Sequence, residues 1–191
     1  MLFIGKTSRN TQVYYHEKLT EPAVREVKRN LPGSLEVSEL CRVIEKYHAV
    51  KKVWIGPAYA YIGSALPPIL DEQIVVLNEE NSHLLQPYFK ELEDHVTERA
   101  PVVACVKDGH AVSVCCSARM SDRAAEAGLE TLASVRGMGL GSQVTAKWIE
   151  EVVRSGLVPL YSTSWDNISS QRIAHKLGLH QYGWDFHLSA E

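Results

Sequence analysis

The chain has 191 residues, 45% of them hydrophobic and 23% charged, a length and composition that fit one globular domain, or one domain with an extension, and exclude two large domains. The formal net charge of −3 gives no basic field of the kind that binds nucleic acid. The four cysteines form no CxxC pair and no paired Cys/His spacing, so reduced thiols are expected rather than a metal site or disulfides.

The amino-terminal part of the chain is predicted to be helical. Hydrophobic spacing predicts helices over residues 21–31 and 37–48, with Leu40, Val43, Ile44 and Tyr47 on the core-facing side of the second and Pro32-Gly33 as the break between them. The apolar run at residues 2–4 is too short for a signal peptide. We therefore expect a cytoplasmic protein in which residues 1–50 form a helical extension and residues 51–191 form the main domain.

The middle of the chain carries weaker signals. The uncharged run from residue 53 to 70 is interrupted by Gly and Pro, so it predicts no membrane-spanning helix and no membrane partner. Its first part, residues 53–68, is interpreted as a short strand and a turn-rich loop, which is either a substrate-lining loop or an ordinary buried connection. A strand is predicted over residues 73–77. Pro87 fits the first turn of a helix that carries Tyr88, Phe89, Leu92 and Val96.

The second half has clearer periodicity. Strands over residues 101–107 and 110–117 are joined by Asp108-Gly109, a typical hairpin turn. Further strands are predicted at residues 124–132 and 157–164, and a last strand near residues 184–188. Two helices separate these strands, one with Val144, Trp148 and Val152 at helical spacing and Gly156 after its end, the other over residues 169–177 and closed by Gly178. This order predicts a mixed α/β sheet.

Glycines are concentrated where the strand at 124–132 leads into the first of these helices, in the stretch Arg136-Gly137-Met138-Gly139-Leu140-Gly141-Ser142. Glycines allow a tight turn with inward N–H groups, and a helix N-terminus adds about half a positive charge, so the stretch can cradle a phosphate. Its spacing fits neither the dinucleotide fingerprint nor the nucleoside triphosphate loop, but it satisfies R-x-x-G-x-G. A flexible turn without a ligand is the alternative.

A second motif follows after one helix and one strand. Asn167, Ser170, Ile173, Lys176 and Gly178 are spaced as N-x-x-[small]-x-x-[apolar]-x-x-K-x-G. In this order the two motifs resemble the GNAT superfamily of acetyl-CoA-dependent N-acetyltransferases. The resemblance is clearest from about residue 101 onward. It implies a mixed α+β fold whose central, mostly antiparallel sheet is splayed between two strands and flanked by helices.

The resemblance also implies a binding site for acetyl-CoA as co-substrate, without a metal. Main-chain N–H groups of Arg136, Gly137, Met138, Gly139, Leu140, Gly141 and Ser142 would bind the pyrophosphate. Main-chain groups of Leu129, Thr131, Leu132 and Ala133 would hold the pantetheine arm. Asn167 and Ser170 would contact that arm, and Lys176 would lie near the nucleotide. The alternatives are a helix cap at Asn167 and a solvated last-turn cation at Lys176.

Acetyl transfer requires a neutral amine, yet an alkylammonium with a pKa of about 10.4 is only about one part in a thousand deprotonated near neutral pH. A general base is therefore useful. Glu126 and Glu130 share strand parity and should point to one face, and the resemblance implies a base carboxylate on this strand. Glu126 is the first candidate and Glu130 the second. An ion pair with Arg119 or Arg123 is the alternative for either.

The resemblance also implies a tyrosine in the last helix that protonates the departing thiolate. Ala174 occupies that position here, so this acid is missing. Tyr161 is the candidate that replaces it, with Tyr182 as another, whereas His175 lies on a different helical face. The adjacent Cys115 and Cys116 suggest a covalent acetyl-enzyme, but no basic partner is placed beside them, and a structural role is favoured.

We therefore expect an N-acetyltransferase that transfers acetyl from acetyl-CoA to a primary amine by direct attack in a ternary complex. The acceptor is a small-molecule or peptide amine, and residues 54–68 are predicted to line its pocket. The alternative is a catalytically weak acyl-CoA-binding sensor or regulatory module. A homodimer is compatible with the sequence, whereas a nucleotide-binding regulator is disfavoured by the failed glycine fingerprints.

Overall fold

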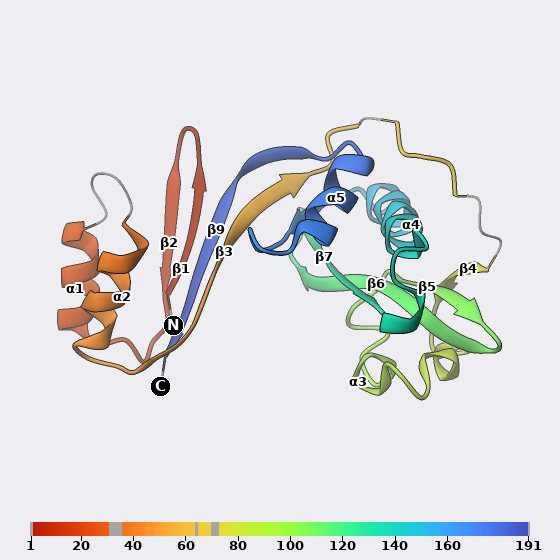
Figure 1. The fold of residues 1–191 in the computed structure, drawn as a ribbon, viewed down its shortest axis with the longest axis horizontal. Coiled ribbons are helices and arrows are strands. Elements are labelled where there is room, and N and C mark those ends of the chain that lie inside the picture. Colours follow the sequence, from red (N-terminus) through yellow and green to blue (C-terminus); the bar gives the residue numbers. More distant parts are fainter. Residues whose placement is uncertain (1, 31–35, 64, 70–72, 191) are drawn as a thin grey trace. The chain divides into compact units, whose positions relative to one another are not determined.

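A computed structural model describes residues 2–30, 36–63, 65–69 and 73–190 of the chain (Figure 1). The chain divides into two compact units. The first holds residues 1–58, 163–166 and 182–191, and the second holds residues 59–162 and 167–181.

The first unit combines strands with a pair of helices. Its strands have the hydrogen-bonded order β2 (Thr11–Tyr15), β1 (Leu2–Thr7), β9 (His180–Ala190) and β3 (Val50–Ala60). Helices α1 (Glu21–Asn30) and α2 (Val37–Glu45) bury one face each in the same core. That core holds Leu2, Ile4, Leu19, Ala23, Val27, Leu40, Val43, Ile44, Phe186 and Leu188. Alternating inward residues of β1 and β9 and the apolar stripes of the helices thus form one hydrophobic cluster.

The structure confirms the two predicted helices of this unit, although their predicted break at Pro32-Gly33 lies outside the described residues. The expected core position of Tyr47 is wrong, because Tyr47 follows the end of α2, is exposed, and donates its hydroxyl proton to Glu26. The hairpin β1-β2 was not predicted. Residues 1–50 therefore contain strands as well as helices, and the division of the chain at residue 50 stays a prediction.

The second unit is built on a mostly antiparallel sheet. Its strands have the order β8 (Val158–Ser162), β7 (Ala124–Thr131), β6 (His110–Met120), β5 (Val102–Lys107) and β4 (Ile74–Leu77). Neighbouring strands are antiparallel from β4 to β7, whereas β7 and β8 are parallel. The predicted mixed, mostly antiparallel sheet is confirmed.

Each face of this sheet has its own core (Figure 1). Helices α4 (Leu140–Arg154) and α5 (Ile168–Lys176) cover one face, where Trp148 and Val144 pack with Cys115 of β6. The 3₁₀ helix η1 (Ser82–Leu85) and the short helix α3 (Lys90–Glu93) belong to the other core, which contains Leu85, Phe89, Leu92, Val96, Val114 and Cys116. The side chains of β6 and β7 therefore divide between two different environments.

The turn residues behave as predicted. Asp108 and Gly109 both have positive φ, 51° and 78°, as a two-residue hairpin turn requires. Gly156 and Gly178 have φ of 78° and 64° just after α4 and α5, so both end their helices in the left-handed conformation.

The helix predicted to begin at Pro87 is wrong in its start and length. Helix α3 begins only at Lys90, because Phe89 before it has a non-helical backbone. Phe89, Leu92 and Val96 are nevertheless buried, so their helical spacing reflects successive turns that face one core.

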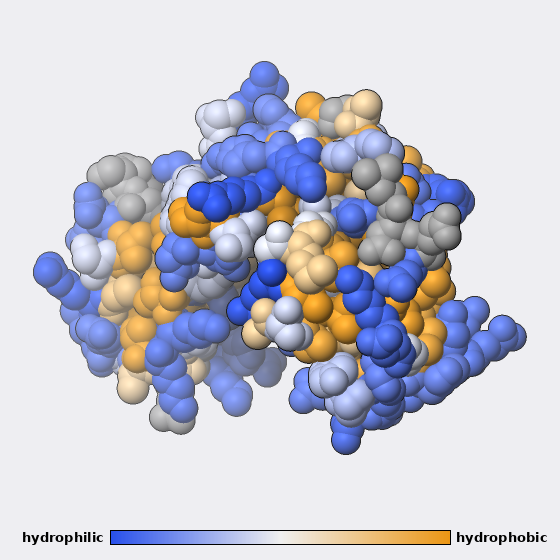
Figure 2. All heavy atoms as spheres, turned by 45° about the vertical axis from the view of Figure 1, so that its right-hand side comes forward, coloured by the Kyte–Doolittle hydropathy of each residue, from blue (hydrophilic) through white to orange (hydrophobic). Residues whose placement is uncertain are grey.

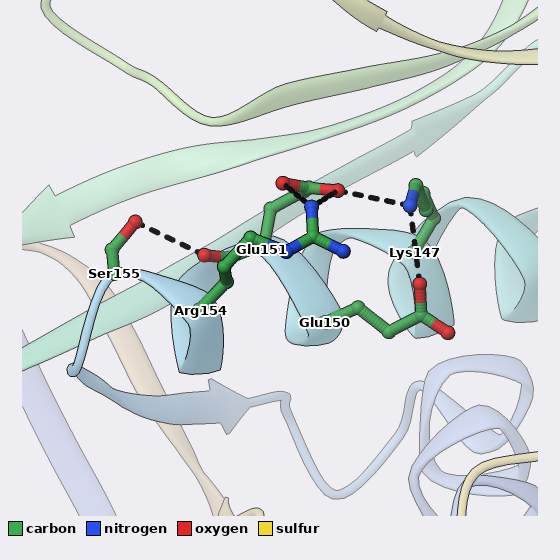
Figure 3. A network of polar contacts seen from close by, with 5 residues as sticks. All are labelled: Lys147, Glu150, Glu151, Arg154 and Ser155. Carbon is green, nitrogen blue, oxygen red and sulfur yellow. Dashed lines mark hydrogen bonds and ion pairs between the residues drawn. The ribbon is translucent and has the colours of Figure 1, made fainter.

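The C-terminal half of α4 carries a network of charges on its outer side (Figure 3). The Lys147 ammonium lies 3.1 Å from Glu150 and 2.9 Å from Glu151, and the Arg154 guanidinium lies 2.6 Å from Glu151. Ser155 donates to the Glu151 carbonyl oxygen at 3.0 Å. The hydrogen bond from Lys147 lowers the pKa of Glu151 below its usual value. Each ion pair between residues three or four positions apart stabilises a helix by about 0.3–0.5 kcal/mol.

The surface in Figure 2 shows hydrophilic side chains with hydrophobic ones gathered in patches between them. In the part of the chain that the structure describes, no helix is both long and apolar enough to cross a membrane. Within the same residues, no cluster of three or more His, Cys, Asp or Glu side chains is arranged to hold a metal ion.

Candidate functional site

The strands β7 and β8 separate after a short paired segment. Residues 124–126 of β7 pair with residues 158–160 of β8. Beyond Glu126, β7 continues to Thr131 without a strand neighbour on this side in the described part of the chain. This is the splay that the sequence analysis expected, and it leaves main-chain N–H and C=O groups of one strand edge open.

The loop that follows β7 needs its glycines for two different reasons. Gly137 and Gly139 have φ of 80° and 82°, a region that side chains disfavour. Gly141 lies in the first turn of α4, where a Cβ atom would lie 3.2 Å from Ile173 Cδ1 and 3.4 Å from Thr131 Oγ1. The first N–H groups of a helix have no partner within the helix, so this tight loop presents free donors at the positive end of α4.

A cavity of about 550 Å³ opens at this point, and we call it the loop cavity. The end of β7, the glycine loop, the first turn of α4 and helix α5 line it. The predicted residues among its lining are Leu129, Glu130, Thr131, Arg136, Gly137, Gly139, Leu140, Gly141, Ser142, Asn167, Ser170 and Lys176. The lining residues that the sequence analysis missed are Val135, Ser169, Arg172 and Ile173.

Three predicted residues of this region, Leu132, Ala133 and Met138, lie outside the lining. Met138 is exposed. Leu132 uses its main-chain groups elsewhere, since its N–H donates to the Val112 carbonyl at 3.0 Å and its carbonyl accepts from Val135 at 3.1 Å. The Leu132 main-chain groups are thus hydrogen-bonded within the protein, and the ligand contacts expected of Met138 and Ala133 stay predictions.

Cationic side chains surround the loop cavity. Arg136 donates from Nε to the Thr131 carbonyl oxygen at 3.2 Å, and Arg172 also lines the cavity. Lys176 donates from Nζ to Ser142 Oγ at 3.0 Å, and Ser142 in turn donates to the Gly139 carbonyl oxygen at 2.8 Å. Lys176 is thus exposed but hydrogen-bonded to the first turn of α4.

Polar residues of β8 and α5 meet at one wall of the loop cavity. Asn167 caps α5, because its side-chain oxygen accepts from the Ser170 N–H at 3.1 Å. The buried Tyr161 places its hydroxyl 2.5 Å from Ser170 Oγ, and burial raises the pKa of Tyr161 to about 12. Tyr161 itself does not line the cavity, so it reaches the cavity only through Ser170. Ala174 is fully buried in the core.

The two candidate carboxylates have different surroundings. Glu126 forms an ion pair with Arg119 at 3.1 Å and accepts from Ser162 Oγ at 2.5 Å. The ion pair with Arg119, which the sequence analysis gave as the alternative role of Glu126, is therefore present. Glu130 is exposed and forms no ion pair within the described residues, and it lines the loop cavity. The free carboxylate next to the loop cavity is thus Glu130.

A second cavity of about 530 Å³ lies on the α3 side of the sheet, and we call it the α3 cavity. Its lining is Pro87, Tyr88, Phe89, Lys90, Glu91, Leu92, Arg99, Val114, Cys116, Gly128, Leu129 and Glu130. The two cavities share Leu129 and Glu130. The two cavities therefore border the same part of β7.

The described residues of the segment 54–68, predicted to line an acceptor pocket, do not line the α3 cavity, and the role of the segment stays a prediction. Tyr59 is buried in the core under α4, and Tyr61 packs against that core. Pro67 and Pro68 line a small cavity of about 150 Å³ beside Ser142.

The adjacent cysteines are enclosed. All cysteines of the chain are free thiols, and Cys115 and Cys116 are buried. Burial raises the pKa of both thiols, which disfavours the thiolate that a covalent acetyl-enzyme would need.

A mixed sheet with two splayed strands, and a glycine loop that opens a helix between them, presents main-chain N–H groups at a helix N-terminus, an arrangement suited to a phosphate-containing ligand. The family model of the GNAT acetyltransferases matches residues 66–183, more than half of the chain. The chain therefore belongs to the GNAT acetyltransferase family. Among curated proteins, none matches the sequence.

Solved structures share this fold at low sequence identity. A GNAT-family protein from Novosphingobium aromaticivorans is 22% identical, with 73% of this chain and 65% of that chain covered and a TM-score of 0.60. A GCN5-related N-acetyltransferase-like protein from Streptococcus suis is 16% identical, with 80% and 68% covered and a TM-score of 0.58. An acetyltransferase from Colwellia psychrerythraea is 11% identical, with 94% and 76% covered and a TM-score of 0.56. The chain thus spans about two thirds of the length of the first two.

Proposed function

We propose that this chain transfers an acetyl group from acetyl-CoA to an amine, by direct attack in a ternary complex. The loop cavity is the observation that carries the proposal. It combines free N–H groups at the start of α4 with the cationic side chains of Arg136, Arg172 and Lys176. Such a site suits the pyrophosphate and phosphate groups of coenzyme A.

The residues present fit the rest of that ligand as well. The open edge of β7 at Leu129–Thr131 offers main-chain groups to the amides of the pantetheine arm. Gly141 has no Cβ, which would otherwise lie against Thr131 and Ile173 and fill the cavity floor. Ser170 and the cap residue Asn167 line the opposite wall. Bound acetyl-CoA supplies the acetyl group as a thioester, activated for attack by a nitrogen nucleophile.

Glu130 is the proposed general base. Its carboxylate is free of ion pairs within the described residues and lies where the two cavities meet. It accepts the proton that the amine nitrogen loses as the N–C bond forms and the C–S bond breaks. Glu126, the first candidate by sequence, forms an ion pair with Arg119 and accepts a hydrogen bond from Ser162. A positioning role therefore suits Glu126 better than the role of general base.

Tyr161 is the proposed source of the proton that the departing sulfur takes up. Its raised pKa, about 12, keeps the phenol protonated at physiological pH. Ser170 Oγ, which lines the loop cavity, lies 2.5 Å from the phenol and relays the proton. The thiol has an ordinary pKa of about 8.5, so the relay aids the reaction without being essential to it.

A catalytically weak acyl-CoA sensor is the second candidate. It is favoured by Ala174, which is fully buried at the position where the family resemblance implies a tyrosine acid. Turnover separates the two functions, since a sensor binds acetyl-CoA without releasing thiol in the presence of amines.

The state of the cysteines is relevant to the cellular compartment in which the protein works. Four free cysteines and no disulfide suit the reducing cytoplasm, so we propose a cytoplasmic location.

The test is calorimetric titration with acetyl-CoA, followed by thiol release over a panel of amines. We expect saturable binding of acetyl-CoA, much weaker binding of NAD and ATP, and thiol release that depends on the amine. Absence of acetyl-CoA binding would overturn the proposal, and binding without turnover over the whole panel would favour the sensor.

A further inference from the structure

The α3 cavity is lined by charges of both signs. Lys90 and Arg99 supply positive charge, and Glu91 and Glu130 supply negative charge. A site for a simple cationic amine gains nothing from the two cations, because like charges repel in a partly enclosed space. A ligand with both an ammonium and a carboxylate matches the whole lining.

Arg99 is the cation of this lining that is best suited to pair with the carboxylate of such a ligand. Its position is set by its main chain, since its carbonyl oxygen accepts the Ser117 N–H of β6 at 2.9 Å. Its guanidinium hydrogen-bonds to Cys116 Sγ, and it pairs with no carboxylate among residues that the structure describes. Because burial raises the pKa of Cys116, that partner is a neutral thiol. Arg99 is exposed and forms no ion pair within the described residues, so its guanidinium is available to a ligand carboxylate at the cavity.

The strand register sets the spacing between Arg99 and Glu130. Cys116, the contact of Arg99, lies opposite Gly128 of β7, and Glu130 is two residues further along that strand. Two residues of a strand span about 7 Å. Gly128 lines the cavity without a side chain, and a Cβ there would lie 3.0 Å from the Ala118 Cβ and 3.4 Å from Cys116 Sγ. Gly128, Arg99 and Glu130 all line the α3 cavity, so a small molecule placed over Gly128 would lie near both charged groups.

We propose that the acceptor is a small amino acid whose carboxylate binds Arg99 and whose amine is presented at Glu130. This assignment rests on the proposed function, because it places the amine beside the acetyl group held in the loop cavity. The guanidinium offers paired N–H donors that match a carboxylate. In the reaction the amine nitrogen forms a bond to the acetyl carbon and loses a proton to Glu130, while coenzyme A leaves as the thiol. The product is an N-acetyl amino acid.

The experiment compares each amino acid with its methyl ester, which keeps the amine and removes only the carboxylate charge. Glycine, β-alanine and 4-aminobutyrate place the amine and carboxylate at three separations, and putrescine serves as a purely cationic amine. We expect kcat/KM to be at least about 30-fold higher for the best amino acid than for its ester, the size of one charged hydrogen-bonded contact. Putrescine should be the poorest acceptor.

Arg99→Gln tests the assigned residue. It should lower kcat/KM for the free amino acid about 30-fold, mainly through KM, and leave the value for the ester within about twofold. Arg99→Lys keeps the charge without the paired donors and should recover part of the loss. Arg123→Gln is the matched control, since Arg123 is exposed and lines neither cavity. Thermal unfolding of each variant separates a folding defect from a binding defect.

The outcomes distinguish this inference from the proposed function. Equal rates with amino acids and their esters would overturn the amino-acid acceptor, and so would a preference for the free amino acid that Arg99→Gln leaves unchanged. Acetyl transfer itself would still be supported by amine-dependent thiol release. If acetyl-CoA does not bind at all, the proposed function fails and the acceptor assignment fails with it.

Discussion

The loop cavity and the α3 cavity meet at Leu129 and Glu130 but are built in opposite ways. A continuous stretch, residues 135–142, supplies much of the loop cavity, and it works largely through main-chain N–H groups and glycine conformations. The α3 cavity collects side chains from separate segments of the chain, residues 87–92, Arg99 and the paired strands β6 and β7. A site built from main-chain groups needs glycines at fixed spacing, so it can be recognised in the sequence. A site built from side chains of separate segments can be recognised only once the pairing of the strands is known.

The largest expected effect is on the carboxylate that the two cavities share. Glu130→Gln should lower kcat by about 100- to 1,000-fold, because the amine loses its proton acceptor. The Kd of acetyl-CoA should change by less than about twofold, since amide and carboxylate have the same size. Thiol release and calorimetry measure the two quantities.

Glu126→Gln is the natural comparison for that variant. It should keep kcat within about threefold and lower the free energy of unfolding by up to about 1 kcal/mol, because it breaks the pair with Arg119. If Glu126→Gln instead abolishes turnover and Glu130→Gln does not, the roles assigned to the two carboxylates are reversed.

The next effect concerns the loop cavity alone. Gly141→Val should weaken acetyl-CoA binding by about 100-fold, equivalent to about 2.7 kcal/mol. The new side chain would occupy the space between Thr131 and Ile173, where even a single Cβ lies within 3.2 Å of a neighbour. Gly5→Ala, where the Cβ would have only ordinary contacts, is the control. Undiminished affinity in a folded Gly141→Val protein would place the ligand elsewhere.

A smaller effect is expected from the cation that is hydrogen-bonded to the first turn of α4. Lys176→Met should raise the Kd of acetyl-CoA about 10-fold, because it removes a charge near the phosphates and the hydrogen bond to Ser142. The loss should shrink as salt concentration rises, since salt screens the charge in the wild type. Lys147→Met, in the partly buried charge network of α4, should leave this Kd unchanged, because Lys147 does not line the loop cavity.

The smallest effect tests the proton relay at the wall of the loop cavity. Tyr161→Phe should lower kcat about fivefold and leave the Kd of acetyl-CoA unchanged, because the phenol assists only the departing sulfur. The pKa of Tyr161 is raised to about 12, so the phenol stays protonated below that pH. The ratio of wild-type to variant kcat should therefore be flat from about pH 6 to about pH 9. Tyr59→Phe is the buried control, and a ratio that rises with pH would contradict the acid role.

Local signals were enough to predict much of the second unit. Asp108-Gly109 placed the β5-β6 hairpin, and Gly156 and Gly178 marked the ends of α4 and α5. The first unit was harder, because β1 offers only Leu2 and Ile4 as buried positions and its pairing with β9 joins opposite ends of the chain. Long-range pairing of this kind has no local signature.

The same division applies to the site. The spacing of Arg136, Gly139 and Gly141 located the loop cavity, and Arg172 was within reach, since it lies one helical turn before Lys176. The sequence could not decide between Glu126 and Glu130 as the general base, because both residues have the same strand parity. Only the parallel pairing of β7 with β8 brings Ser162 to Glu126 and leaves Glu130 free.

The early end of the pairing between β7 and β8 has a consequence for the protein without ligand. Beyond Glu126, the edge of β7 has no strand partner on this side among the residues that the structure describes. A linear ligand with amide groups would pair with this edge as an added strand does in β-augmentation. Such a ligand at about 100 times its Kd adds about 2.7 kcal/mol to the stability of the folded state. The amide protons of β7 should then exchange with solvent more slowly, so the ligand would complete the fold as well as react within it.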